Sequence, residues 1–104
     1  MKIQFNTDNN ISLGEEQIDY FTSLISEEIS RFSPQISRLE IHLSDEDGSK
    51  DGLNDKRCLI EARLEGMKPI AVSEHANTPE QSIFGAIEKL KTSLETLTGR
   101  LKNH

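Results

Sequence analysis

The sequence predicts an α+β domain in which a four-stranded sheet carries two helices packed on one face. Two patterns support this fold class. Some stretches alternate apolar and polar residues, as half-buried strands do, and two others place an apolar residue every three or four positions, as amphipathic helices do. The elements follow in the order β-α-β-β-β-α. Short links between the last three strands favour an antiparallel meander, and we expect the first strand to join the same sheet.

The first part of the chain predicts a strand, then a helix, and the point where that helix ends. Lys2–Asn6 alternates apolar and polar residues. Apolar residues at helical spacing then predict a helix from Gly14 or Glu15 to Phe32. These residues are Ile18, Phe21, Leu24, Ile25, Ile29 and Phe32. Pro34 prevents the helix from continuing, because proline lacks a backbone N–H and its ring clashes with the preceding turn.

Three stretches in the middle of the chain alternate as half-buried strands do. They are Ile36–Ser44, Arg57–Glu65 and Pro69–His75. A polar, acidic loop over Asp45–Lys56 separates the first two, and a tight turn at Gly66–Lys68 separates the last two. The alternation places charged side chains on the face away from the helices. These side chains are Arg38, Glu40, His42, Glu61, Arg63 and Glu65.

The last stretch predicts a long helix over Thr78–Lys102. Thr78 suits the N-cap, Pro79 suits the first helical position, and Gln81 stands three residues after the cap as in a capping box. Apolar residues spaced four and three apart form a stripe that must be covered by the sheet. They are Ile83, Ile87, Leu90, Leu94, Leu97 and Leu101.

Basic residues beside this stripe form the candidate site for a polyanion. At roughly 100° per residue, Lys89 and Arg100 border the stripe on one side, and Lys91 and Lys102 border it on the other. From Lys89 onward the helix carries four cations and one anion. Arg31, at the end of the first helix, is the fifth candidate. The alternative is that these side chains only cover apolar surface with their stems.

The charge balance limits the partners of the chain. Acids outnumber bases by 18 to 12, for a net charge of −6, which argues against nonspecific binding to nucleic acid, and we expect no DNA partner. Residues 1–56 hold 12 acids and 5 bases, whereas residues 57–104 hold 6 acids and 7 bases. Any surface that binds a polyanion should therefore come mainly from the second half.

The length and the cysteine content are those of one small intracellular domain. With 104 residues, we expect residues 1–104 to form a single domain. No apolar run approaches the roughly 20 residues that a membrane span needs, and the N-terminus alternates unlike a signal peptide. Cys58 is the single cysteine and falls on the inward face of its strand, which favours a buried role over a nucleophilic one. These features predict a cytoplasmic protein.

Motifs for catalysis or metal binding are weak. Asp47–Gly52 matches the first half of a calcium-binding EF-hand loop, but Cys58 stands where that loop needs a glutamate, so a solvated acidic loop is the favoured alternative. His42, His75 and His104 are scattered without the spacing of metal ligands. We therefore expect no metal and no cofactor. The absence of nucleotide-binding, zinc-protease and serine-hydrolase motifs favours a binding protein over an enzyme.

Several segments resemble a known family. They are Lys2–Phe5, Ile70–Ser73, Asn77–Thr78 and Ala86–Leu94. Over nearly its whole length the chain is similar to the short hibernation promoting factors and ribosome-associated inhibitor proteins, also called ribosomal subunit interface or sigma modulation proteins. The resemblance implies a fold like that of double-stranded-RNA-binding domains. It also implies docking in the mRNA and tRNA channel of the small ribosomal subunit, on its 16S rRNA, and inhibition of translation under stress by occupancy alone.

The same resemblance assigns the candidate site. Family members contact rRNA phosphates with lysine and arginine side chains of this helix; Lys89 and Lys91 match those positions, and Arg100 and Lys102 fall in the basic C-terminal segment. Because the dimerisation domain of the long form is missing after residue 104, we expect a monomer. The first helix carries only Arg31 where the family carries several bases. The acidic first half therefore leaves an alternative: a diverged member that acts as a protein–protein interaction module without binding rRNA.

Overall fold

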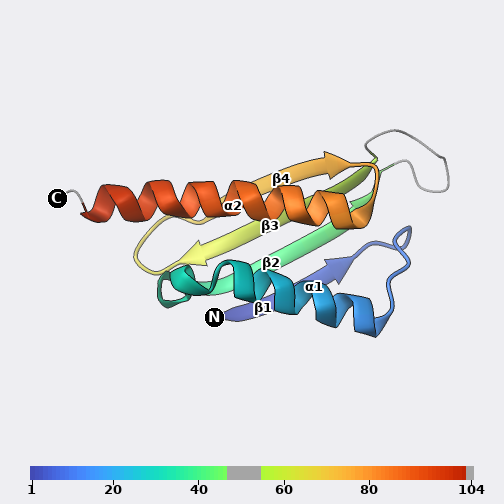
Figure 1. Ribbon diagram of the computed structural model, residues 1–104, viewed down its shortest axis with the longest axis horizontal. Helices are drawn as coiled ribbons and strands as arrows, with labels where there is room; N and C mark the ends of the chain where they lie inside the picture. Colours follow the sequence, from blue (N-terminus) through green and yellow to red (C-terminus); the bar gives the residue numbers. More distant parts are fainter. Residues whose placement is uncertain (47–54, 103–104) are drawn as a thin grey trace.

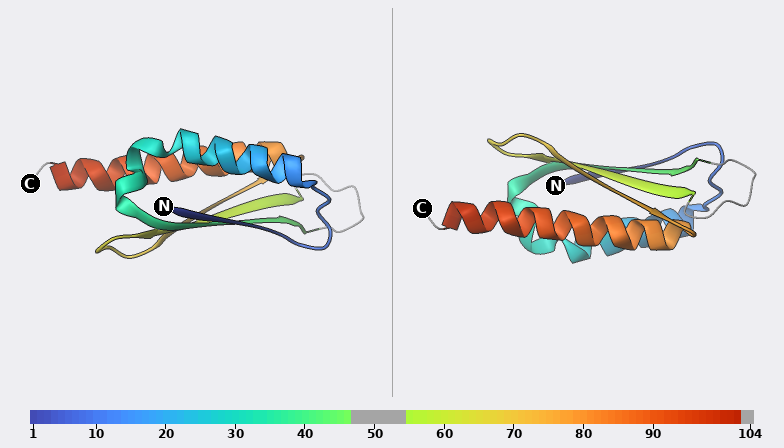
Figure 2. Two further views of the ribbon diagram at one scale, coloured as in Figure 1. Left: turned by 90° about the horizontal axis from the view of Figure 1, so that it is seen from below. Right: turned by 90° about the horizontal axis from the view of Figure 1, so that it is seen from above.

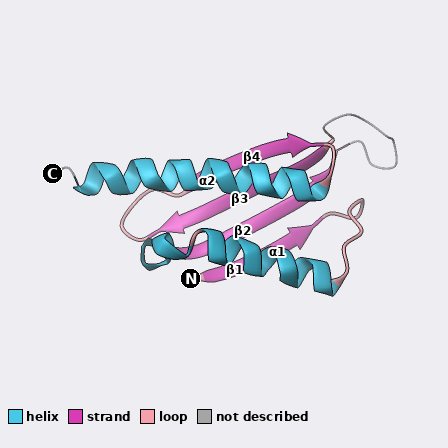
Figure 3. Cartoon of the chain, viewed as in Figure 1, coloured by secondary structure: helices cyan, strands magenta, loops and turns pink. Residues whose placement is uncertain are grey.

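The computed structural model confirms the predicted α+β class and the order of the elements (Figures 1 and 3). It describes residues 1–46 and 55–102, the last three by their backbone alone. The elements are β1 (Lys2–Thr7), α1 (Glu15–Glu28), the 3₁₀ helix η1 (Ser30–Gln35), β2 (Ile36–Asp45), β3 (Lys56–Leu64), β4 (Ile70–Ala76) and α2 (Pro79–Lys102). The segment that resembles a calcium loop, residues 47–58, falls mostly outside the described residues.

The four strands form one mixed sheet in the order β1-β2-β3-β4. β1 pairs with β2 in parallel, whereas β2 with β3 and β3 with β4 pair antiparallel, as the predicted meander requires. A parallel pair needs a crossover connection, and α1 supplies it between β1 and β2. Both helices lie on the same face of the sheet, and in the described part of the chain no helix covers the other face (Figure 2).

The core lies between this sheet and the two helices. The predicted inward residues of the strands meet the apolar stripes of α1 and α2 there, and Ile25, Leu39, Ile60 and Leu90 have no solvent exposure at all. α2 packs mainly on β4 and β3, while α1 lies over the β1 side of the sheet. The two helices run in the same direction, with their N-termini at the same end of the molecule (Figure 1).

The first helix is shorter than predicted. The α-helix ends at Glu28 and the chain continues as the 3₁₀ helix η1, in which the Phe32 N–H donates to the Ile29 carbonyl over 2.9 Å. The reason is Pro34, whose ring cannot tolerate an α-helical carbonyl four residues earlier, so the backbone tightens before it. Ile29 and Phe32 nevertheless stay buried, because the tighter turn keeps both side chains directed at the sheet.

The predicted start of α2 and the turn before β4 are both confirmed. The hydroxyl of Thr78 accepts a hydrogen bond from the Gln81 N–H over 3.1 Å, and Pro79 is the first helical residue. Gly66, between β3 and β4, has a φ of 70°, a left-handed conformation that favours glycine. None of the helices in the described ranges is long and apolar enough to cross a membrane.

Candidate nucleic-acid interface

α2 positions two of the predicted cations, Lys89 and Lys91, on opposite sides of itself. The ammonium group of Lys89 reaches β4, where it donates to the Ser73 carbonyl over 2.8 Å. Lys91 points the other way, toward α1, and donates to Oε2 of Glu28 over 3.1 Å. Two residues in sequence correspond to roughly 200° around a helix, so the two side chains lie on the two borders of the apolar stripe, as predicted.

Lys89 lies beside the carboxylate of Glu74, and a glycine in α2 leaves room for that carboxylate. Its Nζ atom lies 3.5 Å from Oε1 of Glu74, and its side chain is 52% exposed. Glu74 comes from β4 and packs where α2 carries Gly85: a β-carbon at Gly85 would lie 2.5 Å from Cγ of Glu74. The missing side chain of Gly85 therefore makes room for the acid that accompanies Lys89.

Lys91 lies between two carboxylates. In addition to Glu28, Oε1 of Glu88 lies 3.7 Å from its Nζ atom. The hydrogen bond to Glu28 and the negative charge of Glu88 raise the pKa of Lys91 above its ordinary value. The side chain is charged at physiological pH, and the two acids offset that charge locally.

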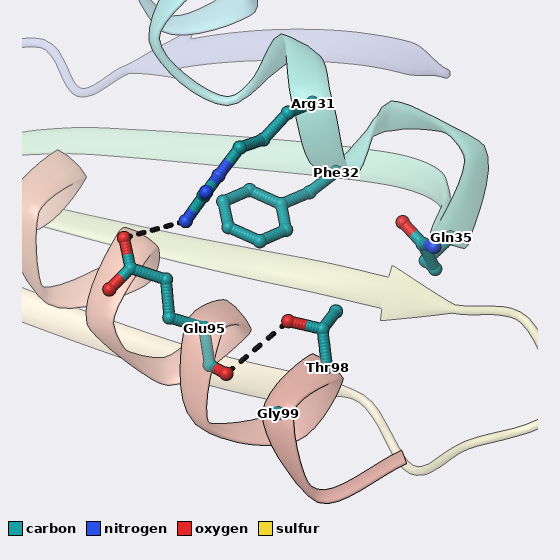
Figure 4. A pocket seen from close by; sticks show the side chains of 6 residues that line it. All are labelled: Arg31, Phe32, Gln35, Glu95, Thr98 and Gly99. Atoms are coloured by element: carbon teal, nitrogen blue, oxygen red, sulfur yellow. Dashed lines mark hydrogen bonds and ion pairs between the residues drawn. The ribbon is translucent and has the colours of Figure 1, made fainter. Parts of the chain in front are cut away.

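Arg31, in η1, pairs with an acid of α2 one helical turn after Lys91. Its Nη2 atom lies 2.8 Å from Oε1 of Glu95, and its guanidinium group stacks 4.5 Å from the centre of the Phe32 ring. Figure 4 shows Arg31 and Glu95 facing each other across a depression of about 680 Å³ between η1 and the C-terminal half of α2. The depression is lined by Arg31, Phe32, Gln35, Glu95, Thr98 and Gly99.

The structure thus brings together only part of the predicted site. Arg31 and Lys91 lie on the α1 side of α2 and Lys89 lies on the β4 side, and each has a carboxylate within 3.5 Å. Arg100 and Lys102 belong to the last turn of α2, but their side chains lie outside the described residues. The assignment of all five to rRNA stays a prediction.

Sequence reasoning missed the acids that accompany these cations. Glu28 and Lys91 are 63 residues apart in the chain, and Arg31 and Glu95 are 64 apart, so no local spacing connects them. Lys89 and Glu74 are closer in sequence, but they lie on different elements. These three pairs arise only when α2 docks beside α1 and β4, whereas the contact of Lys91 with Glu88 lies within α2.

Cys58 has the buried position that the alternation of its strand predicts. It has no solvent exposure, and burial raises the pKa of its thiol to about 12. A thiolate is the nucleophilic form of cysteine, so burial disfavours the reactive form of this residue. Its part in the protein is to pack in the core.

Comparisons with known proteins give a family match and solved structures with a similar fold. The profile of the family described as "Sigma 54 modulation protein / S30EA ribosomal protein" matches residues 3–102. The N-terminal domain of Protein Y from Thermus thermophilus superposes with a TM-score of 0.71 at 18% identity, over 93% of this chain and 99% of that one. A ribosomal subunit interface protein from Coxiella burnetii gives a TM-score of 0.69 at 16% identity, over 95% and 99%. These two structures show a shared fold. Among curated protein sequences, none matches the chain significantly.

Proposed function

The chain belongs to the sigma 54 modulation protein and S30EA ribosomal protein family, and from that membership we propose that it binds the small ribosomal subunit and inhibits translation under stress. The family match over residues 3–102 carries the proposal. In this proposal, the chain is one monomeric domain in the cytoplasm. It docks in the mRNA and tRNA channel and contacts 16S rRNA through five cations. These are Lys89, Lys91, Arg31, Arg100 and Lys102. Inhibition needs occupancy alone, so the proposal requires no catalytic group.

The ion pairs described above are compatible with phosphate binding. Lys89 is 52% exposed, and exposed pairs such as Lys89–Glu74 contribute only about 0–1 kcal/mol in water. A phosphate can therefore take the place of the carboxylate at small cost. Each such exchange yields less than an unpaired lysine would, so we expect weaker binding than the number of cations suggests, with a salt dependence still set by the number of phosphate contacts.

Co-sedimentation with purified small subunits at low and moderate salt tests this proposal. The variant Lys89→Glu with Lys91→Glu should bind more weakly, and the slope of log K against log salt should fall by about 1.4–1.8 for two lost phosphate contacts. The control is Lys2→Glu with Arg63→Glu, which changes the net charge equally on the face of the sheet away from the helices. Failure to co-sediment at low salt rejects the proposal. If the control variant loses as much affinity for the small subunit, the contact with the subunit does not lie on α2.

A second candidate function is supported by the surface of α1. The helix exposes five acids, and the 3₁₀ turn that follows it holds Arg31 against Glu95. The acids are Glu15, Glu16, Asp19, Glu27 and Glu28. Such a surface is complementary to a basic protein, which is the chemistry of a protein–protein interaction module without rRNA.

Neutralising the paired acids separates the two functions. Glu28→Gln with Glu74→Gln releases Lys91 and Lys89 from the carboxylates nearest to them, and should strengthen binding to the small subunit. Glu15→Gln with Glu16→Gln is the matched control, with the same change in net charge at the far end of α1. If the control strengthens binding equally, net charge and not the pairing limits affinity. A basic protein partner would instead be captured in a nuclease-insensitive manner and lost in both variants.

A further inference from the structure

The face of the sheet that no described helix covers carries an unusual trio of side chains. Glu40 and His42 lie two residues apart on β2, so both point to this face, and Glu61 on β3 is the direct cross-strand partner of Glu40. All three are partly exposed to solvent. Two like charges opposite each other in neighbouring strands are destabilising, unless a cation lies between them.

The donor atoms of the trio converge on one point. Nε2 of His42 lies 3.2 Å from Oε1 of Glu61 and 3.6 Å from Oε2 of Glu40, and three donor atoms of the trio lie within 4.8 Å of one another. Nε2 is almost completely enclosed, yet it makes no hydrogen bond of acceptable geometry to any described residue. The ring nitrogen Nε2 and two carboxylate oxygens thus face one another, and in the neutral tautomer protonated at Nδ1 the Nε2 lone pair is available as a ligand.

These distances suit a small tetrahedral ion. Ligand bonds of about 2.1 Å around Zn²⁺ place neighbouring donor atoms about 3.4 Å apart, which lies between the two distances measured here. The other oxygen of Glu40, Oε1, forms an ion pair with Nε of Arg38 at 2.9 Å, although without hydrogen-bond geometry, and Oε2 faces His42. Such contacts to a ligand's second oxygen commonly hold metal ligands in place.

We propose that Glu40, His42 and Glu61 form a binding site for one divalent transition-metal ion of the Zn²⁺ class, with the fourth position open to solvent. An imidazole nitrogen with two carboxylates suits zinc and its neighbours, whereas Mg²⁺ and Ca²⁺ prefer oxygen ligands only and more of them. The spacing rules used on the sequence missed this trio because its ligands lie on two strands that pair only in the fold. The inference does not depend on binding to the ribosome.

Calorimetric titration of the full chain with Zn²⁺ tests the proposal. We expect one ion per chain, and at least a tenfold loss of affinity in His42→Gln and in Glu61→Gln. His75→Gln is the control: His75 also pairs with a carboxylate, with Nε2 3.0 Å from Oε1 of Glu46, but lies outside the trio. Its affinity should be unchanged. A chain that binds no Zn²⁺, or that binds it equally well in His42→Gln, overturns the proposal.

Cobalt provides a second measurement that does not rely on heats of binding. Co²⁺ in a tetrahedral nitrogen and oxygen site absorbs visible light far more strongly than hydrated Co²⁺, so the wild type and His75→Gln should develop this absorption and His42→Gln should not. Circular dichroism checks that each variant is folded, as expected for partly exposed side chains. Displacement of Co²⁺ by Zn²⁺ but not by excess Mg²⁺ supports the assignment, and displacement by Mg²⁺ contradicts it.

Discussion

The contact between Gly85 of α2 and Glu74 of β4 gives a prediction whose size can be worked out from the structure. A β-carbon at Gly85 would lie 2.5 Å from Cγ, 2.7 Å from Oε2 and 3.0 Å from Cδ of Glu74. Cγ is near the backbone of Glu74, so a small movement of the carboxylate does not relieve the overlap. Gly85→Ala must therefore push the whole Glu74 side chain into another rotamer, away from Lys89.

Two opposing effects set how much Gly85→Ala changes the free energy of unfolding. Alanine is favoured over glycine in a helix interior by about 0.8–1.0 kcal/mol, because glycine loses more backbone freedom on folding. Overpacking a contact costs about 1–3 kcal/mol. We therefore expect Gly85→Ala to change the free energy of unfolding of the wild type by between about 0 and −2 kcal/mol. In a Glu74→Ala background the overlap is gone, and the same substitution should stabilise by about 1 kcal/mol.

Urea denaturation of the wild type, both single variants and the double variant measures this difference as a coupling energy. The expected coupling between Gly85 and Glu74 is about 1–3 kcal/mol, well above the roughly 0.3–0.5 kcal/mol scatter of independent sites. If Gly85→Ala stabilises both backgrounds equally, Glu74 does not occupy the space beside the glycine. The account of how Lys89 acquires its carboxylate would then be wrong.

Two further predictions concern the cap of α2 and the core. Thr78→Ala removes the acceptor of the Gln81 N–H and should cost about 1 kcal/mol in urea denaturation, whereas Thr78→Ser should retain most of the stability. Burial raises the pKa of the Cys58 thiol from 9.0 to about 12, so between these values the unfolded chain loses the proton first. Stability should therefore fall as the pH rises through this window, and less steeply in Cys58→Ala; equal slopes would contradict the burial argument.

Much of the fold follows from local pattern. The stripe of α2 and the alternation of the strands correctly place Leu90, Ile60 and Leu39 in the core, because periodicity reports directly which side of an element is buried. The cap at Thr78 is equally local, since its donor is three residues away. The early end of the first α-helix is a local effect too, but the residues before Pro34 keep a helical apolar spacing that conceals it.

The candidate site depends on contacts that no local pattern contains. The sequence shows that Lys89 and Lys91 border the stripe of α2, but the acids nearest to them come from β4 and α1. Likewise Glu61 meets Glu40 only through the register of β3 on β2. Side-chain spacing within one element cannot reveal such groups, because the partners are fixed by which strands and helices become neighbours.

In the proposed function, the ion pairs around α2 limit how Lys89 and Lys91 can bind a phosphate. A phosphate that binds Lys89 or Lys91 must displace a carboxylate, and the displaced carboxylate stays attached close by, where it repels the phosphate. The same acids are the groups that would attract a basic protein. Glu28 and Glu74 therefore have opposite effects on binding in the two functional hypotheses. Removing their charge should strengthen binding to rRNA and weaken binding to a basic protein. If the proposed binding to the small subunit occurs through α2, we expect its affinity to depend less on how many cations α2 carries than on how readily these two side chains can turn away.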